Sequence, residues 1–434
     1  MHAQIRVRRR SAAVAAGASA SLLLAMIATS AGAAPTTPPG LVKNNASCPA
    51  TPGVSPTSVT FGWVGPKTGA AAANYLFSSE GAQLRIDQEN AKGGVNGRKI
   101  IFKVYDDQSN GSGQITAVQK AIQSDNVFGM TAQTNITSMY PTLKDNNIPV
   151  TGFSNPAFGT DRNAFGNNGA TLSSNPALAS TGVLEKLKQQ GVTKIANINH
   201  VSTGASASGN ATAALMQYVP GLTQVLRIAD EPQGAHDATS TALRIKQSGA
   251  DGAIIVGFID GGISIMQALK QQGVTLKGVS LVGLSDPAVL KNTNGALDGV
   301  LGTNYGTVPV GVPNNPAVRT YANGMKAAGL NPYSSAAPQG FLGADLFITG
   351  LKLAGKCPTR ESFITNLRNL TKYNGHGLLA ETVSMKGPGL VANGNPALCT
   401  WYMIAKGTDL TPDSKATCGA KIIDTSTGKV VYGG

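Results

Sequence analysis

Short apolar stretches alternate with longer amphipathic stretches along most of this chain, and the alternation occurs in two rounds. The apolar stretches have the length of buried strands, and the amphipathic stretches have a helical period. The first round predicts strands at 58–64, 99–105, 127–130 and 148–152, with helices at 75–91, 114–124 and 138–146. The second round predicts helices at 178–190, 205–218, 238–248 and 263–272, with strands at 194–199, 222–228, 253–257 and 279–283. Such alternation builds parallel sheets with right-handed crossovers, so we expect an α/β fold with two doubly wound parallel-sheet lobes.

The stretch 93-GGVNG-97 separates the first predicted helix from the second predicted strand. Its two leading glycines are typical of a helix end, and its Asn-Gly pair is typical of a tight turn. Asp106 and Asp107 follow at the carboxyl end of that strand, which is where ligands bind in doubly wound sheets. We interpret them mainly as architectural residues: Asp106 or Asp107 would accept loop N–H groups and order the link into the next helix. Direct ligand contact is the alternative.

The first 33 residues have the three parts of a secretory signal peptide. Residues 6–10 are rich in arginine, residues 12–28 are apolar or small, and 31-AGA-33 matches an A-x-A cleavage site. We therefore predict export to the periplasm, the cell envelope or the extracellular space, with cleavage near Ala33. A retained membrane anchor is the alternative, whereas a lipid anchor is not supported, because the first cysteine, Cys48, lies well beyond the cleavage site. Residues 34–56 are rich in Pro, Thr, Ala and Asn, and we predict a flexible leader there.

Charge and metal-binding residues argue against several classes of function. Removing the four arginines of residues 1–33 lowers the formal net charge from +13 to +9, and no run of five basic residues remains. We therefore expect no nucleic-acid partner. The four histidines are dispersed and no C-x-x-C pair occurs, so we predict no metal site. The run 350-GLKLAGKC-357 resembles a phosphate-binding loop, but a cysteine replaces the required Ser or Thr, and we predict no cofactor.

No arrangement of residues in the sequence predicts catalysis. A G-x-S-x-G nucleophile motif does not occur, and His200 is the one histidine at the end of a predicted strand where a ligand would bind. A lone histidine at such a place is typical of a loop hydrogen bond. We therefore predict that the protein is not an enzyme.

Four cysteines, Cys48, Cys357, Cys399 and Cys418, follow the signal peptide. An even number of cysteines in an exported protein predicts that all are paired, here in two disulfides. Three pairings are possible. Among them we favour Cys357–Cys399 with Cys48–Cys418.

Three segments carry a resemblance to a known family: 65-GPKTG-69, 81-GAQLRIDQENAKGGVNGRKI-100 and 104-VYDDQSN-110. Together they resemble the type I extracytoplasmic solute-binding proteins, and within these the leucine/isoleucine/valine-binding family of ABC transporters. Looser likeness continues through 148-IPVTGFSNP-156 and 281-LVGLSDPAVLK-291. The resemblance implies a monomer that binds a small solute and delivers it to the permease and ATPase subunits of an importer.

The resemblance also implies how the lobes are built. Family members have two lobes joined by three crossings, which would fall here near 171–175, 303–307 and 376–381. Lobe 1 would then comprise residues 57–174 and 306–377. Lobe 2 would comprise residues 175–305 together with the C-terminal region 378–434. The lobes would close on the solute by a hinge motion.

Amino-acid-binding members of the family bind the ligand carboxylate at the ends of two lobe 1 strands. The corresponding residues of this sequence are Gln133, Thr134, Asn135, Ser154 and Asn155. Short polar side chains and helix N-termini at these places suit an anion. The alternative is that these residues only cap the next helix or form a turn.

Further ligand-binding residues are implied by the resemblance in the first loop and in lobe 2. Asn74 and Tyr75 fall at the family's aromatic position in the first loop, and Thr203 stands where the family often has an aromatic residue. After two later strands come Phe258 and Asp260, and then Ser285 and Asp286. Either aspartate is a candidate partner for a ligand ammonium group. Asp286 precedes a proline, and helix capping is the role that we favour for it over a ligand contact.

The resemblance favours a branched-chain or related amino acid as the solute. Thr203 and Ser285 depart from the family pattern, so another small carboxylate, an amide or a urea-type solute remains open. A ligand-sensing receptor module with the same fold is the alternative to an importer component.

Overall fold

The computed structural model describes residues 48–153, 157–167, 178–201, 203–304, 306–386 and 399–433. The predicted signal peptide, most of the predicted leader and the expected crossing at 171–175 lie outside the described residues, as do Ser154 and Asn155. Within the described ranges, no helix combines the length and the apolar character needed to cross a membrane.

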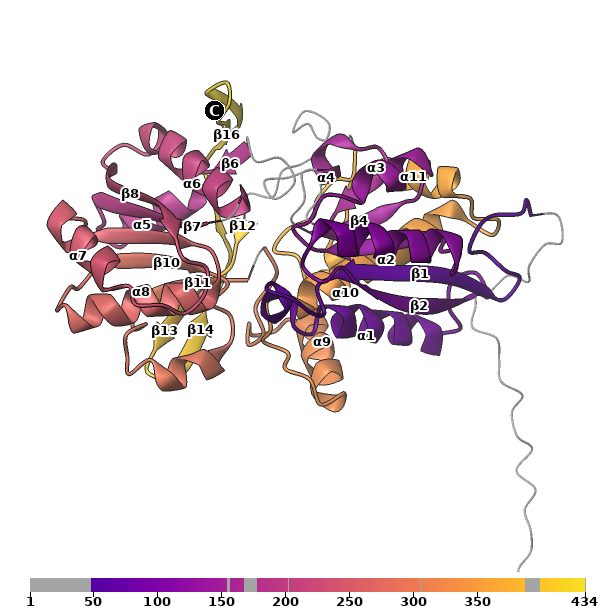
Figure 1. The fold of residues 1–434 in the computed structure, drawn as a ribbon, viewed down its shortest axis with the longest axis horizontal. Coiled ribbons are helices and arrows are strands. Elements are labelled where there is room, and N and C mark those ends of the chain that lie inside the picture. The colour runs from indigo at the N-terminus through magenta and orange to yellow at the C-terminus, as the bar shows by residue number, and fades with distance from the viewer. Residues whose placement is uncertain are drawn as a thin grey trace, which may run out of the picture. The chain divides into compact units, whose positions relative to one another are not determined.

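The first sheet has the strand order β2-β1-β3-β4-β5, with every neighbouring pair parallel (Figure 1). Its strands are β1 (Ser58–Gly65), β2 (Lys99–Asp106), β3 (Gly129–Gln133), β4 (Val150–Phe153) and β5 (Ala164–Gly166). The helical elements around it are η1 (Ala72–Tyr75), α1 (Ser78–Ala91), α2 (Gly111–Gln123), α3 (Tyr140–Asp145), α4 (Ala157–Thr160), α9 (Pro316–Ala327), α10 (Ala337–Ala354), α11 (Arg360–Arg368) and η4 (Gly375–Gly377). Helices α1, α10 and α11 share one core with Phe61 and Trp63 of β1, whereas α2 and α3 share another with Val64 and Met130.

The second sheet has the strand order β14-β13-β11-β10-β9-β7-β8. Its parallel strands are β7 (Lys194–His200), β8 (Thr223–Glu231), β9 (Gly252–Val256), β10 (Gly278–Val282) and β11 (Val300–Thr303), and β13 (Tyr402–Lys406) and β14 (Asp409–Pro412) extend it antiparallel. The helical elements around it are α5 (Gly182–Gln189), α6 (Thr203–Leu215), η2 (Met216–Tyr218), α7 (Thr239–Ser248), α8 (Ile259–Gln271) and η3 (Pro287–Asn292). Helices α7 and α8 share a core with Ile255 and Leu281, and α5 and α6 share one with Ile254 and Leu301. Both faces of this sheet are therefore covered, as its continuous apolar strands require.

The sequence predicts a single helix at 178–190, and this prediction is wrong for its first residues. The structure has strand β6 (Leu178–Ser180) followed by α5. Strand β6 pairs antiparallel with β16 (Ile422–Asp424), which also pairs with β17 (Lys429–Tyr432). The partner that makes residues 178–180 a strand lies near the other end of the chain, so no local pattern indicates it.

The predicted turn at 93-GGVNG-97 is confirmed. Asn96 and Gly97 both have positive φ angles, 50° and 80°, and the Val95 N–H donates to the Arg98 carbonyl at 2.8 Å. Gly94 also has a positive φ, 77°, and a Cβ at this position would lie 1.9 Å from the Arg98 carbonyl oxygen. Only glycine fits there, which explains why the helix stops at this place.

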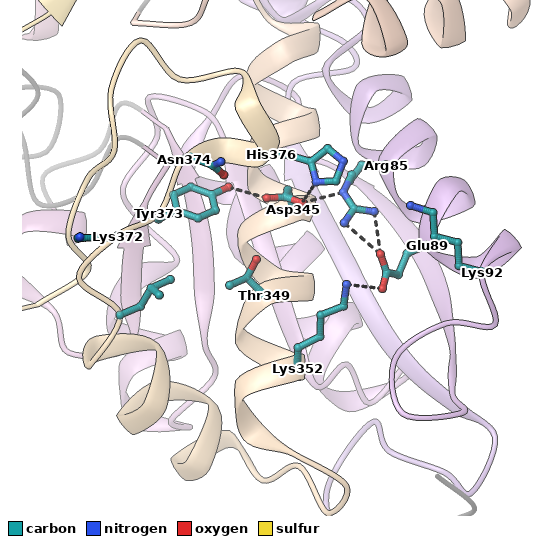
Figure 2. Close-up of a pocket in the computed structure, with 11 residues that line it drawn as sticks. Arg85, Glu89, Lys92, Asp345, Thr349, Lys352, Lys372, Tyr373, Asn374 and His376 are labelled. Carbon is teal, nitrogen blue, oxygen red and sulfur yellow. Dashed lines mark hydrogen bonds and ion pairs between the residues drawn. The ribbon is translucent and has the colours of Figure 1, made fainter. Parts of the chain in front are cut away.

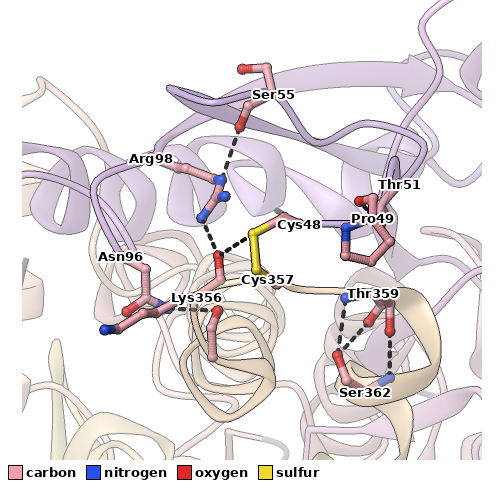
Figure 3. The surroundings of a disulfide bond; sticks show 11 residues. Cys48, Pro49, Thr51, Ser55, Asn96, Arg98, Lys356, Cys357, Thr359 and Ser362 are labelled. Carbon is pink, nitrogen blue, oxygen red and sulfur yellow. Dashed lines mark hydrogen bonds between the residues drawn. A yellow bond between two sulfur atoms is a disulfide. The ribbon is translucent and has the colours of Figure 1, made fainter. Parts of the chain in front are cut away.

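All four cysteines are paired, but the favoured pairing is wrong. Cys48 bonds to Cys357 (Figure 3), and Cys399 bonds to Cys418. Cys399 and Cys418 are direct partners in the antiparallel pair of β12 (Cys399–Thr400) and β15 (Thr417–Cys418). The Cys48–Cys357 bond joins two segments that Arg98 also holds together. The Arg98 guanidinium donates to the Ser55 carbonyl and to the Lys356 carbonyl, at 2.9 Å each.

Candidate ligand-binding site

The carboxyl end of β2 is fixed to the glycine loop that follows β1. Asp106 Oδ1 accepts the N–H groups of Lys67 (2.9 Å), Thr68 (3.2 Å) and Gln108 (2.8 Å). The Thr68 hydroxyl donates to Oδ2 at 2.6 Å. Burial alone would raise the pKa of Asp106, but these donors keep it below its ordinary value. The interpretation of Asp106 as an acceptor of loop N–H groups in the link after β2 is confirmed by the bond from Gln108.

Asp107 is a loop acceptor as well, but in a fully buried position. Its Oδ1 accepts the Ser109 N–H at 2.9 Å, and its Oδ2 accepts the Thr134 hydroxyl at 2.5 Å. Burial raises the pKa of Asp107. Thr134 Oγ1 in turn accepts the Ile136 N–H at 3.1 Å. Asp107 therefore connects the loops that follow β2 and β3.

The predicted ligand-binding residues of lobe 1 differ in their burial and in whether their side chains are hydrogen-bonded within the protein. Gln133 is buried and donates through Nε2 to the Gln339 carbonyl of α10 at 3.0 Å. Asn135 is exposed just beyond β3, whereas Asn74 and Tyr75 are half-buried in η1. Since Val64 of β1 lies opposite Ala132 of β3, the loops after these strands begin at the same end of the sheet.

At the carboxyl end of β9, Phe258 is the N-cap residue of α8 and is half-buried. Its backbone N–H donates to Nδ1 of His200, the last residue of β7, at 2.9 Å. The interpretation of His200 as a loop hydrogen bonder is therefore confirmed. Asp260 lies exposed in the first turn of α8. Thr203 begins α6, but its side chain lies outside the described residues.

The residues after β10 are engaged by the segment that precedes α10. Ser285 is buried, and its hydroxyl donates to the Tyr333 carbonyl at 2.9 Å. Asp286 is the N-cap of η3: its Oδ1 accepts the Ala288 N–H at 2.8 Å. Its Oδ2 accepts the Asn331 side-chain amide at 2.5 Å. Capping is therefore confirmed as a role of Asp286, and both its carboxylate oxygens have protein partners.

A separate pocket of about 290 Å³ lies among α1, α10 and the segment before η4 (Figure 2). Its centre is a buried ionic network. Arg85 donates to Asp345 at 2.7 Å and to Glu89 at 3.0 Å, Lys352 pairs with Glu89 at 2.5 Å, and the Tyr373 hydroxyl donates to Asp345 at 3.1 Å. Burial alone would raise the pKa of Glu89, but the contacts with Lys352 and Arg85 keep it below its ordinary value. Both carboxylates of the pocket are thus engaged by the protein, and the network joins α1 to α10.

A comparison with known families bears on this arrangement of two sheets with connecting helices. The family model described as periplasmic binding protein matches residues 58–405, which is more than half of the chain. This chain belongs to the periplasmic binding protein family. The match begins at β1 and ends within β13, so it includes strands of both sheets.

Individual relatives of this periplasmic binding protein are distant. An amino acid binding protein of Pseudomonas aeruginosa is 25% identical over 297 residues, which is 66% of this chain and 78% of that protein. A branched chain amino acid ABC transporter protein of Thermus thermophilus, solved with bound valine, has a TM-score of 0.70 at 16% identity and covers 84% of this chain and 97% of that chain. The fatty acid ABC transporter substrate-binding protein of Thermomonospora curvata has a TM-score of 0.69 at 15% identity and covers 89% of this chain and 98% of that chain. The solved structures confirm the expected α/β fold with parallel-sheet lobes.

Sequence reasoning missed the residues that contact the predicted site from a distance. Asn331 and Tyr333 engage Asp286 and Ser285 from more than forty positions along the chain. The run 331-NPYSS-335 indicates a turn, but nothing in it indicates what the turn contacts. The partnership of Thr134 with Asp107 is similar, since the two residues follow different strands.

Proposed function

We propose that this periplasmic binding protein is the exported substrate-binding component of an ABC importer. The observation that carries the proposal is the family match, which runs from β1 into β13 and so includes the parallel strands of both sheets and the loops after them. In such a protein the solute binds between two lobes, here residues 57–174 with 306–377 and residues 175–305 with 378–434. The crossings near 171–175, 303–307 and 376–381 would form the hinge. A permease and an ATPase would be the membrane partners, and the receptor would act as a monomer.

Closure follows from the solute's contacts with both lobes. A solute that contacts polar groups of both lobes binds the closed form more tightly than the open form. The ratio of these two affinities sets how far the solute shifts the equilibrium toward the closed form. Loops after β1, β3 and β4 would supply one set of contacts, and loops after β7, β9 and β10 the other. The hydrogen bonds of Asp106 and Asp107 keep two of the lobe 1 loops in fixed positions. The receptor therefore needs little local rearrangement when it closes.

The solute we propose first is a branched-chain or related amino acid. Its carboxylate would bind at the end of β3, where the exposed Asn135 amide is a suitable donor. Ser154 and Asn155 would complete this set from the loop after β4. Asn74, Tyr75 and Phe258 would contact the aliphatic side chain.

The ammonium group of the solute needs an acceptor, and Asp260 is the better candidate of the two aspartates. Both oxygens of Asp286 already accept hydrogen bonds from Ala288 and Asn331. Asp260 is exposed in the first turn of α8. An Asp260 carboxylate that pairs with the ammonium group would make the receptor selective for amino acids over simple carboxylic acids.

The test compares leucine with 4-methylpentanoate, which has the same chain and carboxylate but no amine. We expect Asp260→Asn to weaken leucine binding about tenfold, as loss of a charged hydrogen bond of about 1.5 kcal/mol implies, and to leave 4-methylpentanoate unchanged. Isothermal titration calorimetry measures both affinities. Asp409→Asn, which removes another exposed carboxylate of the second sheet, is the matched control. Equal loss for both ligands, or no loss for leucine, would rule out Asp260 as the ammonium partner.

A second candidate solute is a carboxylate without an amine. The engagement of Asp286 favours it, since that residue stands near the position where amino-acid binders often have an acid. Wild-type protein that binds 4-methylpentanoate at least as tightly as leucine would support this class. The proposal of an importer component stands in either case.

A further inference from the structure

His200 occupies an unusual position at the end of β7, beneath the first turn of α8. The residue is 1% exposed. A Cβ at Gly257 would lie 1.9 Å from its Nδ1, and a Cβ at Gly261 would lie 2.7 Å from its Cε1. The imidazole therefore fits only because glycines stand at both places. Its ring is in direct contact with the backbone that carries Phe258.

The hydrogen bond of His200 determines its protonation state. Nδ1 accepts the Phe258 N–H at 2.9 Å, and an imidazole nitrogen that accepts an N–H carries no proton. The proton of the ring is therefore on Nε2, which is buried and has no hydrogen-bond partner in the described part of the chain. A second proton, on Nδ1, would place two donors against each other and break the bond to Phe258.

The charged groups around His200 come from β8, the loop after it, and α8. Glu231 ends β8 and is 3% exposed, and it accepts from the Thr241 hydroxyl at 2.8 Å. His236 Nε2 lies 2.8 Å from the other Glu231 oxygen, and α8 contributes the exposed Asp260. Burial lowers the pKa of His200, and Glu231 opposes this shift only in part. Burial alone would also lower the pKa of His236, but its bonds to the Gly234 carbonyl and to Glu231 raise it above the ordinary value.

We propose that His200 is a positioning residue of the ligand site, which as a neutral imidazole keeps Phe258 and the first turn of α8 in place, and which releases them when Nδ1 is protonated. This inference rests on the proposed function in one respect, namely that Phe258 and Asp260 contact the solute. Because the folded pKa of His200 lies below its value in the unfolded chain, the unfolded chain binds the proton more readily. The His200 contribution to stability is therefore complete at neutral pH and is lost as the pH falls through the range below about 6.5.

Two substitutions separate hydrogen bonding from titration. His200→Asn places an amide oxygen near the position of Nδ1, so it keeps the acceptor but has no proton to gain. His200→Leu removes the acceptor. His236→Gln is the control, because it removes the neighbouring histidine and leaves the bond between His200 and Phe258 intact.

The first readout is solute affinity, measured by calorimetry with leucine at about pH 7.5 and about pH 5. We expect the wild type and His236→Gln to lose affinity about two- to tenfold at the lower pH, the range that loss of one hydrogen bond implies. His200→Asn should bind as tightly as the wild type at neutral pH and show no such loss. His200→Leu should bind more weakly at both pH values. If the loss persists in His200→Asn, or disappears in His236→Gln, the proposal is overturned.

A second readout needs no solute and no variant. Hydrogen exchange of the Phe258 amide in the wild type should show a protection factor that falls when the pH is lowered, while amides in the middle of β9 stay protected. An unchanged protection factor would overturn the proposal even if leucine binds as expected. If none of a set of amino acids and small carboxylates binds to the protein, that result counts against the proposed function. The hydrogen-exchange result would still decide the role of His200.

Discussion

Asp106 and Asp107 are adjacent in the sequence, yet their environments move their pKa values in opposite directions. Asp106 faces four donors at the protein surface, and its pKa lies below the ordinary value. Asp107 is fully buried, and its pKa is raised by burial. Successive residues of an extended strand point to opposite faces, so this difference follows from their position at the end of β2. Together they fix the loops after β1, β2 and β3.

Removing the Thr134 hydroxyl should destabilise the protein, because Asp107 would lose a partner in a buried position. We expect Thr134→Ala to lower the free energy of unfolding by about 1–3 kcal/mol, as measured by urea denaturation. Thr134→Ser retains the hydroxyl and should stay close to the wild type. Equal stability of the alanine and wild-type proteins would show that the 2.5 Å contact contributes nothing.

The sequence predicted residues whose partners are local and missed those whose partners are distant. The bonds of Asp106 to the Gln108 N–H and of Asp107 to the Ser109 N–H, and the capping role of Asp286, follow from Asx-type chemistry within a few residues. The bonds of Ser285 to Tyr333 and of Gln133 to Gln339 join segments that meet only in the folded chain. Whether Asn74, Tyr75, Asn135, Thr203, Phe258 and Asp260 contact a solute stays a prediction.

Helices α1 and α10 are joined by the buried guanidinium of Arg85, so the stability of their contact depends on this one side chain. Arg85 is about 2% exposed and contacts both Asp345 and Glu89. Gly81 of α1 and Gly340 of α10 allow the two helices to approach closely. A Cβ at Gly81 would lie 2.1 Å from the Ala337 carbonyl oxygen, and a Cβ at Gly340 would lie 1.8 Å from the Ser78 carbonyl oxygen. Without Arg85, Asp345 would keep only the Tyr373 hydroxyl and His376 as polar partners in the described structure.

Arg85→Ala should therefore lower the free energy of unfolding by about 3–5 kcal/mol, the usual effect of leaving a buried charge unpaired. The matched control is Arg162→Ala. Arg162 forms an ion pair with Glu361 on the surface, with half or more of both side chains exposed, and its removal should cost less than about 1 kcal/mol. Chemical denaturation of both variants measures the difference. Similar losses for the two arginines would contradict the assigned role of the buried network.

The two disulfides constrain separate parts of the chain. Cys48–Cys357 fixes the segment before β1 to the end of α10, across 309 positions, and Cys399–Cys418 closes a loop across 19 positions. Peptide mapping without reduction should recover these two linkages and no free thiol. Recovery of Cys357 linked to Cys399 would contradict the structure. We expect the double substitution Cys48→Ser with Cys357→Ser to destabilise the protein by about 4–6 kcal/mol, because the closed loop is long.

At the scale of the whole molecule, the two rounds of strand–helix alternation were enough to predict the fold class. Strands β1, β2, β7 and β9 begin and end within one residue of the predicted positions. The C-terminal strands were not predicted. β13 pairs with β11 and β16 pairs with β6, so these two strands take their strand character from partners far along the chain. β14 then pairs with β13 in a hairpin at the edge of the second sheet. Sequence patterns report local periodicity, and these elements depend on pairing that periodicity does not encode.

The central claim is that this periplasmic binding protein captures a small solute of the amino acid or carboxylate class. The most direct test is thermal denaturation of residues 34–434, freed of bound molecules, in a panel of amino acids, aliphatic carboxylates, amides and urea compounds. At a hundredfold excess over its dissociation constant, a true solute adds about 2.7 kcal/mol to the free energy of unfolding. We therefore predict a clear rise in Tm with at least one amino acid or carboxylate, and an unchanged Tm across the whole panel would contradict the claim.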